Sequence, residues 1–312
     1  MNAGSSVARA WYPAALLAAF LSVDALACRP AASTAADLGA GEGPAPHEPF
    51  VESRRLHPTM LRSAAPSPER LGEPPTPAAA EAVRYPSPAG DLLAWFAKPA
   101  GGGPHPVLVY FHGGFALAPS DFALMEPVLA ARWAVMTPSW RGENGNPGSL
   151  ELLFGELDDA IAAIAWAADQ PGVDPARIHV LGHSVGGGLA ALVSLRPDAK
   201  VVDTASVGGL YVPETFVRWA ASAGNAKLVR FDPAVRTERE LRVLGPHLAD
   251  MVHPHQAYVG RQDLPFVENA AGLLDAATRM GAPLRIEFVD GDHESSLRVA
   301  IAVWLAAHGA TP

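Results

Sequence analysis

The stretch that decides the fold is Ile178-His-Val-Leu-Gly-His-Ser-Val-Gly-Gly-Gly-Leu-Ala190. It joins a short apolar run to a serine between glycines and then to residues that favour a helix. Within it, Gly182-His-Ser-Val-Gly186 fits the pattern Gly-x-Ser-x-Gly, in which a strand turns sharply into a helix and holds the serine in a strained conformation. A side chain at either flanking glycine would collide with the neighbouring backbone of that turn. The pattern favours Ser184 as a nucleophile, and the alternative is an ordinary serine in a glycine-rich turn.

Strand-like and helix-like segments alternate around this turn. Short apolar runs predict strands at residues 82–85, 92–97, 106–111, 133–137, 178–181, 200–207, 255–260 and 284–289. Helical patterns predict helices at residues 121–132, 150–170, 185–195, 267–280 and 297–308. The first two strands fit a hairpin, and the later alternation predicts an α/β fold with a mostly parallel central sheet and helices on both faces. Residues 211–251 are irregular and mixed, and we expect a small lid-like insertion there.

Three residues with the chemistry of a nucleophilic triad each follow a predicted strand. Ser184, Asp263 and His293 occur in the order serine, acid, histidine. A serine hydroxyl is a poor nucleophile unless a base takes its proton, and the base needs a carboxylate that holds its tautomer. Because the carboxyl ends of parallel strands share one edge of the sheet, we expect these side chains to meet there. Three further acids are alternatives to Asp263, namely Glu268 and, very close in sequence to the histidine, Asp290 and Asp292.

Backbone amides that could hold an oxyanion are predicted at two places. One is the amide of Val185, directly after the candidate nucleophile. The other lies in His112-Gly-Gly-Phe115, where Gly113 or Gly114 would let the main chain approach a substrate closely. The alternative is a plain turn after a strand, which accounts for one glycine more easily than for two glycines and a histidine.

Composition excludes several classes of protein. The chain has 312 residues, 49% of them hydrophobic, which is enough for a substantial core. Its 32 acidic residues outnumber 23 basic ones and give a net charge of −9, so we expect no nucleic-acid partner. Cys28 is the single cysteine, which excludes an intrachain disulfide framework and a cysteine zinc site. His253 and His255 have no carboxylate or cysteine at ligand spacing, and we expect neither a metal nor a cofactor.

The first 80 residues differ from the rest of the chain. Residues 1–27 have the layout of a secretory signal peptide, and the alternative is a buried N-terminal helix. Cleavage before Cys28 would resemble bacterial lipoprotein processing, although Ala25 stands where that pattern prefers leucine. Residues 28–80 are rich in Ala, Pro, Gly, Ser and Glu and predict a disordered tether, which leaves residues 81–312 as the folded domain. We expect an exported protein of a bacterial cell envelope, tethered to the membrane through a lipid on Cys28.

Several ordered motifs resemble the α/β-hydrolase superfamily, and within it the prolyl oligopeptidase-like and dienelactone hydrolase-like catalytic domains. The motifs are Tyr110-Phe-His-Gly-Gly-Phe115, Arg141-Gly-Glu-Asn-Gly-Asn-Pro-Gly148, Gly155-Glu-Leu-Asp-Asp159, Val173-Asp-Pro-Ala-Arg-Ile178 and Gly182-His-Ser-Val-Gly-Gly187. The resemblance covers residues 81–307 and implies a nucleophile at Ser184, an acid at Asp263 and a base at His293. The Arg141 motif either lines a pocket or braces the edge of the sheet. Asp158 and Asp159 fit helix-face charges or a brace for that loop.

The resemblance implies an activity without defining its substrate. It implies a serine hydrolase that cleaves a small-molecule ester or a peptide or amide bond through an acyl-enzyme. The large prolyl oligopeptidases carry an N-terminal propeller, whereas about 80 residues of low complexity precede the domain in this sequence, so oligopeptide selectivity does not carry over. Leu264-Pro265 also replaces the valine and proline that usually follow the acid. The alternative function is a catalytically inactive, surface-tethered binding module on a hydrolase scaffold.

Overall fold

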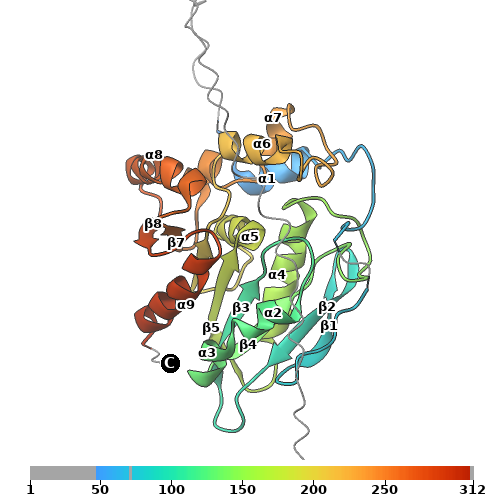
Figure 1. The fold of residues 1–312 in the computed structure, drawn as a ribbon, viewed down its shortest axis with the longest axis vertical. Helices are drawn as coiled ribbons and strands as arrows, with labels where there is room; N and C mark the ends of the chain where they lie inside the picture. Colours follow the sequence, from blue (N-terminus) through green and yellow to red (C-terminus); the bar gives the residue numbers. More distant parts are fainter. Residues whose placement is uncertain (1–46, 70–71, 310–312) are drawn as a thin grey trace, which may run out of the picture.

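The computed structural model describes residues 47–69 and 72–309, whose strands form one eight-stranded sheet. The strand order across the sheet is β1-β2-β4-β3-β5-β6-β7-β8 (Figure 1). The strands are β1 (Glu81–Ser87), β2 (Gly90–Ala97), β3 (His105–Phe111), β4 (Ala134–Pro138), β5 (Val173–His183), β6 (Asp203–Val207), β7 (His255–Gly260) and β8 (Leu284–Val289). Each predicted strand is present, and β5 begins five residues earlier than the predicted start at residue 178.

The pairing of the strands matches the predicted sheet. β1 and β2 form an antiparallel hairpin, and β2 also runs antiparallel to β4. From β4 through β3, β5, β6 and β7 to β8, each strand pairs in parallel with the next. Every residue of β3 and β4 is buried, which explains their continuous apolar sequence, because helices cover both faces of a parallel sheet. The predicted α/β fold with a mostly parallel sheet is confirmed.

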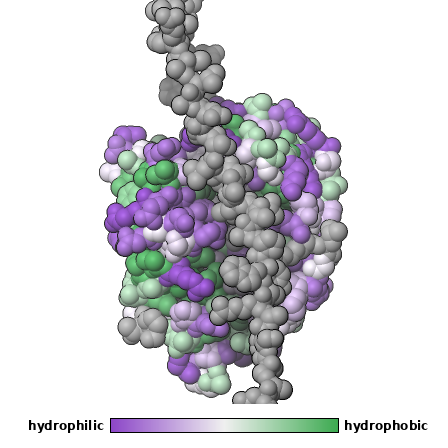
Figure 2. Space-filling model, viewed as in Figure 1, coloured by the Kyte–Doolittle hydropathy of each residue, from purple (hydrophilic) through white to green (hydrophobic). Residues whose placement is uncertain are grey.

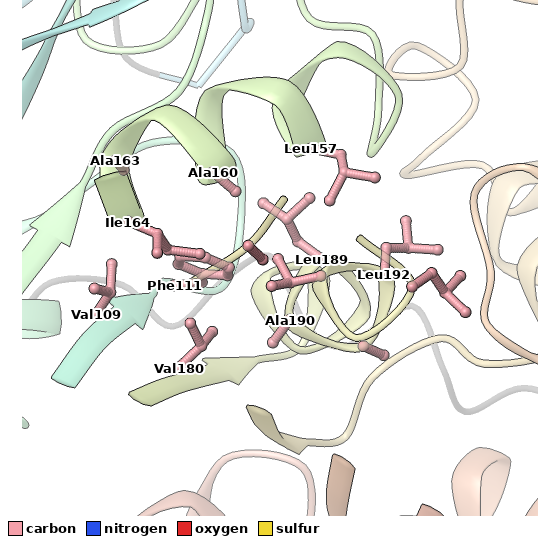
Figure 3. Close-up of a cluster of buried hydrophobic side chains, with 14 of the residues drawn as sticks. Val109, Phe111, Leu157, Ala160, Ala163, Ile164, Val180, Leu189, Ala190 and Leu192 are labelled. Atoms are coloured by element: carbon pink, nitrogen blue, oxygen red, sulfur yellow. The ribbon is translucent and has the colours of Figure 1, made fainter. Parts of the chain in front are cut away.

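Helices cover both faces of this sheet. They are α1 (Phe50–Leu56), α2 (Pro119–Ala123), α3 (Glu126–Ala130), α4 (Gly155–Ala168), α5 (Val185–Val193), α6 (Pro213–Ala221), α7 (Arg236–Glu240), the 3-10 helix η2 (Gly245–Asp250), α8 (Leu264–Met280) and α9 (Ser295–Ala307). On one face, α4 and α5 pack on the central strands in a cluster that includes Phe111, Leu157 and Leu189 (Figure 3). On the other face, α3 and α9 contribute Val128 and Trp304 to a second cluster.

Two helices differ from the sequence-based expectation. The predicted helix at residues 121–132 is two short helices, α2 and α3, because Pro127 lacks an amide hydrogen and stands in the first turn of a new helix. The predicted helix at residues 150–170 begins only at Gly155. Leu152 and Leu153 have φ values of 55° and 69°, a left-handed backbone that a right-handed helix cannot contain. The side chain of Glu156 holds this turn, because its Oε1 accepts the amide of Leu152 at 3.2 Å.

The predicted lid at residues 211–251 is a packed cap made of α6, α7 and η2. Figure 1 shows α6 and α7 beside α1 at one end of the molecule. Phe216, Phe231 and Val243 of the cap are fully buried in an apolar cluster with Phe115 and Val259. Because Phe115 follows β3 and Val259 lies near the end of β7, this cluster fixes the cap to the carboxyl edge of the sheet. The insertion is thus confirmed, although it is helical where the sequence suggested irregular structure.

The expectation of a disordered tether as far as residue 80 is wrong for residues 47–69 and 72–80. α1 buries Phe50 completely, and Arg54 donates from Nη2 to the carbonyl oxygen of Phe154 at 2.8 Å. The segment has few large apolar residues to bury. The anchored helix α1 and a series of hydrogen bonds fix it to the domain instead. The predicted signal peptide at residues 1–27 and the candidate lipid site Cys28 lie outside the described residues.

Residues 57–69, called the strap below, continue from α1 across the cap. Thr59 donates from its hydroxyl to Glu238 of α7 at 2.8 Å. Arg230 of the cap donates to the carbonyl oxygen of Ala65 in the strap. The strap thereby reaches the loop that follows β3, where the candidate oxyanion glycines lie.

Hydrophilic and hydrophobic residues are interspersed over the face that Figure 2 shows. The exposed large hydrophobic side chains are spread over several elements, from Met60 in the strap to Leu264 at the start of α8. Within residues 47–69 and 72–309, no helix combines the length and apolar character that a membrane crossing requires.

Candidate active site

Ser184 stands at the turn between β5 and α5 in a strained conformation. Its φ of 55° and ψ of −118° lie outside the regions that a side-chain-bearing residue normally occupies. Its amide donates to the carbonyl oxygen of Val207 at 2.9 Å, which fixes the turn to the end of β6. A Cβ atom on Gly182 would overlap the carbonyl of Gly186, and one on Gly186 would overlap the carbonyl of Phe111. The structure therefore confirms that both flanking positions require glycine.

Three predicted side chains form one chain of hydrogen bonds. The hydroxyl of Ser184 donates to Nε2 of His293 at 2.9 Å, and Nδ1–H of His293 donates to Oδ2 of Asp263 at 2.7 Å. The carboxylate can only accept, so the proton lies on Nδ1 and the lone pair of Nε2 faces the serine. The residues lie at positions 184, 263 and 293, and the ends of β5, β7 and β8 bring them together. Their arrangement allows the serine to lose its proton as it attacks.

The surroundings of His293 fix the plane and position of its ring. Asp263 is 5% exposed and directly precedes α8. The ring of Phe266, one turn into that helix, stacks on the imidazole with the centroids 5.4 Å apart. His183 donates from Nε2 to the backbone carbonyl of His293 at 2.8 Å, and burial lowers the pKa of His183, so this imidazole is neutral. The ring of His293 is therefore held from its own backbone, from its face and from Nδ1.

The alternative acids have other positions. Asp290 is exposed and pairs with Arg261, with Oδ1 and Nε 3.4 Å apart. Asp292 accepts the amide of Ser295 at 2.8 Å in the turn that starts α9. Glu268 is exposed on α8. Among the acids weighed from the sequence, Asp263 is the one whose carboxylate contacts the imidazole.

The loop after β3 lies directly against the serine. A Cβ atom on Gly113 would come within 3.3 Å of Cβ of Ser184, and Gly114 has a φ of +72°. Val185, whose amide is the other predicted donor, is the first residue of α5. The amide of Phe115 donates to Oε2 of Glu69 at 3.1 Å, so that amide is already bonded. Gly113, Gly114 and Val185 thus remain the candidate oxyanion donors, and they lie on the two backbone segments that flank the serine.

Sequence reasoning missed the two strap residues that hold this loop. Ser67 donates from its hydroxyl to the carbonyl oxygen of Phe115 at 2.5 Å, and Glu69 accepts the amide of the same residue. Both peptide groups of one loop residue are thus bonded to the strap. The surrounding sequence resembles a linker, and no spacing relates it to residues almost 50 positions later, so the sequence contains no signal for this contact.

A buried ion pair lies beneath the same loop. Nε2 of His112 donates to Oε2 of Glu143 at 3.1 Å, and both side chains are almost completely buried. Burial lowers the pKa of His112, but the attraction of Glu143 outweighs this effect, and the pKa rises to about 9. His112 is therefore an imidazolium at neutral pH, and Nδ1 donates to the carbonyl oxygen of Gly113 at 2.9 Å. The charge orients the first peptide of the glycine loop.

The Arg141 motif braces the edge of the sheet. Arg141 donates from Nε and Nη2 to the two carboxylate oxygens of Asp159 at 2.8 and 2.9 Å, a bidentate pair with little exposure. The amide groups of the motif continue the brace, since Oδ1 of Asn144 accepts the amide of Leu117 at 2.9 Å. Asp158 lies on a different side, where its carboxylate meets Arg196. These contacts fit the predicted brace, and Glu143 of the same motif also lines a pocket at the serine turn, as the other predicted role requires.

Two apolar pockets lie near these residues, one against the serine turn and one against Phe266, which stacks on His293. One is lined by Phe115, Leu152 and Val185, with the buried carboxyl of Glu156 in its wall. Burial raises the pKa of Glu156 to about 7. The other lies between the cap and α8; Tyr211, Thr215, Phe266 and Ile286 are among its lining residues. Both pockets are mostly apolar, as are the sites that take the uncharged parts of small ligands.

The histidines weighed as metal ligands are bonded separately. His253 bonds from Nε2 to the carbonyl oxygen of Arg196 at 3.0 Å, and His255 lies between the hydroxyls of Thr204 and Ser206. Two other groups among the described residues have donor atoms close enough to share a metal ion. They are His183, His293 and Glu294 at the serine, and His179, Asp203 and His308 farther away.

Comparison with known proteins identifies relatives of the same fold. A family model described as the alpha/beta hydrolase fold matches residues 106–263. Carboxylic ester hydrolase LipN of Mycobacterium tuberculosis is 34% identical over 119 residues, which are 36% of this chain and 30% of LipN. A Mycobacterium tuberculosis puromycin-hydrolyzing peptidase superposes with a TM-score of 0.62 and 20% identity over 74% of this chain and 40% of the peptidase. Thermogutta terrifontis esterase 2 superposes with a TM-score of 0.58 and 19% identity over 76% of this chain and 98% of the esterase.

These similarities confirm the resemblance predicted from the motifs. The family model covers the strands from β3 to β7 together with the serine turn and Asp263. The solved structures extend the likeness of fold to about three quarters of the chain. The chain spans less than half the length of the curated relatives that it matches.

Proposed function

Since the chain belongs to the α/β-hydrolase family, we propose that it is a serine hydrolase that cleaves an ester or amide bond through an acyl-enzyme. The observation that supports this proposal most strongly is the chain of hydrogen bonds from Ser184 through His293 to Asp263, at 2.9 and 2.7 Å. A strained serine at the carboxyl edge of the sheet supports it further, because that strain is a cost that a structural turn does not require.

The proposed reaction has two halves. In the first, Oγ of Ser184 bonds to the carbonyl carbon while its proton passes to Nε2 of His293. The tetrahedral intermediate then expels an alcohol or amine, which takes that proton, and an acyl-enzyme remains. In the second half, water gives its proton to Nε2 as its oxygen attacks the acyl carbon. The acid is released and Ser184 regains its proton.

Asp263 and the backbone amides stabilise the charges of this reaction. The carboxylate faces Nδ1 of His293 and stabilises the imidazolium that forms when Nε2 takes the serine proton. The amides of Val185 and of the Gly113–Gly114 loop flank the serine and would donate to the oxyanion. The ion pair between His112 and Glu143 keeps the glycine loop in place before substrate arrives.

An active-site-directed fluorophosphonate tests this proposal. We expect the reagent to label the purified protein once and to leave Ser184→Ala unlabelled. Ser222→Ala in the cap is the matched control, and it should label like the wild type. Persistent labelling of folded Ser184→Ala would assign the nucleophile elsewhere. A folded protein that neither labels nor hydrolyses any short p-nitrophenyl ester or aminoacyl anilide would favour the inactive binding module.

The pockets, and not the triad, would determine whether the protein prefers ester or amide substrates. The triad is common to both reactions, and the relatives include a protein named as an ester hydrolase and one named as a peptidase. The apolar linings support a substrate with an uncharged acyl or leaving group. Rates for a panel of acyl p-nitrophenyl esters and aminoacyl anilides would rank the two bonds, and a Val185→Trp substitution that fills the first pocket should change that ranking.

Export and lipidation rest on the first 28 residues alone. We propose that the signal-like residues 1–27 direct export to the cell envelope and that Cys28 carries a lipid. The test is membrane association of the full chain in a bacterial host. Cys28→Ser should move the protein from the membrane fraction to the soluble fraction, and unchanged association would refute the anchor.

A further inference from the structure

A second group of histidine and aspartate side chains lies away from the serine. His179 belongs to β5, Asp203 is the first residue of β6 and His308 directly follows α9. Nδ1 of His179 lies 2.9 Å from Oδ1 of Asp203, and Nε2 of His308 lies 3.0 Å from Oδ2 of the same carboxylate. The donor atoms of all three residues are within 4.8 Å of one another. We call these three residues the distal cluster.

The hydrogen bonds of His308 require a cation at this point. Nδ1 of His308 lies 2.8 Å from the carbonyl oxygen of Trp304, which can only accept, so Nδ1 carries a hydrogen. Nε2 faces a carboxylate oxygen, which also only accepts. The lone pair of a neutral Nε2 would therefore point at a negatively charged oxygen. Either a second proton or a metal ion must lie between Nε2 and Asp203.

We propose that the distal cluster binds a divalent transition-metal ion of the zinc class through His179, Asp203 and His308. Two imidazoles and one carboxylate are a donor set that proteins use for such ions. With bonds of about 2.1 Å, tetrahedral zinc holds its ligand atoms about 3.4 Å apart. The carboxylate–imidazole distances of 2.9 and 3.0 Å, each to a different oxygen of Asp203, are shorter than that value, and the donor atoms of all three residues lie within 4.8 Å of one another.

The surroundings of the cluster also suit a metal. The carbonyl oxygen of Trp304 fixes the tautomer of His308, so that Nε2 is the free ligand atom, and metal-binding histidines are generally oriented by such a bond. The rings of Trp133 and Trp304 contact both imidazoles. The side chain of His179 is 6% exposed and that of Asp203 is 25% exposed, so the site is sheltered but open on one side. A water molecule could complete four ligands.

The proposed site is separate from the catalytic one. Ser184 lies five residue steps along an extended strand from His179, a span of about 16 Å. The ion would join the central strands to the end of the last helix, and it would hold structure together without touching the substrate. It therefore stands independently of the proposed hydrolase function.

Calorimetric titration of the full chain with Zn²⁺ tests the proposal. The titrated protein is prepared without a polyhistidine tag, because such a tag would itself bind zinc. We expect one zinc ion per chain, and about 10-fold or greater loss of affinity in Asp203→Asn and in His308→Gln. Zinc at about 100 times its dissociation constant should raise Tm of the wild type by about 5–10 °C and leave Tm of the two variants almost unchanged.

The matched control is His293→Gln, which removes the central ligand of the other group of potential donors, His183, His293 and Glu294. Zinc affinity that is unchanged in His293→Gln and lost in the distal variants establishes the site. Loss in His293→Gln alone, equal binding by all variants or no binding by the wild type overturns it and leaves a proton between His308 and Asp203. Circular dichroism verifies folding, and His308→Gln decides if Asp203→Asn does not fold.

Discussion

Among the described residues, two clusters that each join an aspartate to a histidine differ in their third partner. One is the distal cluster, and the other, called the catalytic cluster below, consists of Ser184, His293 and Asp263. At the carboxyl edge of the sheet, His293 lies between Asp263 and the hydroxyl of Ser184. In the distal cluster, Asp203 lies between two imidazoles. A hydroxyl can release a proton to the imidazole and become a nucleophile, whereas a second imidazole offers another lone pair. The same pair of residue types is therefore suited to acyl transfer in one place and to holding a cation in the other.

The backbone explains why each cluster received its third partner. Both clusters use β5 and the ends of α9, since Ser184 follows the strand that contains His179, and His293 and His308 flank the helix. The serine stands at a positive φ, outside the strand, where its hydroxyl projects beyond the edge of the sheet. His179 stands inside the regular ladder and can only project onto one face. α9 spans about 20 Å, which keeps the two imidazoles at its ends apart.

Substitution of the third partner in each cluster should give the largest difference in kcat between the two clusters. We expect Ser184→Ala to lower kcat for a p-nitrophenyl ester by about 10³-fold or more, with a residual rate from the oxyanion donors. His308→Ala should change kcat less than about 2-fold, because it lies near the opposite end of α9. Steady-state kinetics of the two variants and the wild type measure this contrast. A loss in His308→Ala that approaches that of Ser184→Ala would contradict the separation.

Removal of the two carboxylate charges should give the next largest difference. In Asp263→Asn the amide cannot stabilise the imidazolium and favours the wrong tautomer of His293. We therefore expect kcat to fall about 10²- to 10⁴-fold, while Tm changes by no more than a few degrees. In Asp203→Asn, kcat should remain close to the wild-type value while zinc-dependent stabilisation is lost. Kinetics and thermal unfolding of both variants give the two readouts. If Asp203→Asn loses activity while it remains folded, the clusters are coupled.

Substitutions in the strap should have a smaller effect on kcat, and they test the support of the glycine loop beside the catalytic cluster. Ser67 and Glu69 both bond to the backbone of Phe115, so Ser67→Ala and Glu69→Ala should let the glycine loop shift. We expect a fall in kcat of about 10-fold with little change in KM, because the loop would donate to the transition state and not to the ground state. Ser63→Ala, in the same strap, is the control. A rise in KM at constant kcat would instead make these residues substrate contacts.

Local patterns predicted the catalytic cluster because its residues follow strands. The apolar run of β5, the two obligatory glycines and the positions of Asp263 and His293 after β7 and β8 all follow from short stretches of sequence. Parallel strands then place those stretches at a common edge. The sequence therefore predicted which side chains meet, and their roles in catalysis stay predictions until kinetics test them.

The remaining contacts depend on packing between distant segments. His308 and Asp203 are 105 residues apart, and Ser67 and Phe115 are 48 apart, with no motif that relates either pair. The strap has the composition of a linker, yet hydrogen bonds and the burial of Phe50 in α1 hold it on the domain. Composition measures how much apolar area a segment can bury, but it does not measure the acceptors that a neighbouring domain offers.

The smallest expected effect is a pH dependence of kcat that arises from His112 beneath the glycine loop and not from the distal cluster. The pKa of His112 is raised to about 9, so its ion pair with Glu143 contributes fully to stability below about pH 6.5 and loses that contribution as the pH rises through 9. Once His112 is neutral, the glycine loop loses its charged support, and kcat should fall about 2- to 5-fold between pH 8 and 10. Asp203→Asn should keep this profile, since it is remote from the loop. Glu143→Gln removes the attraction that raises the pKa, so its kcat should already be low at pH 7 and show no further fall near pH 9. A wild-type decline that persists unchanged in Glu143→Gln would assign the titration to another group and detach the ion pair from catalysis.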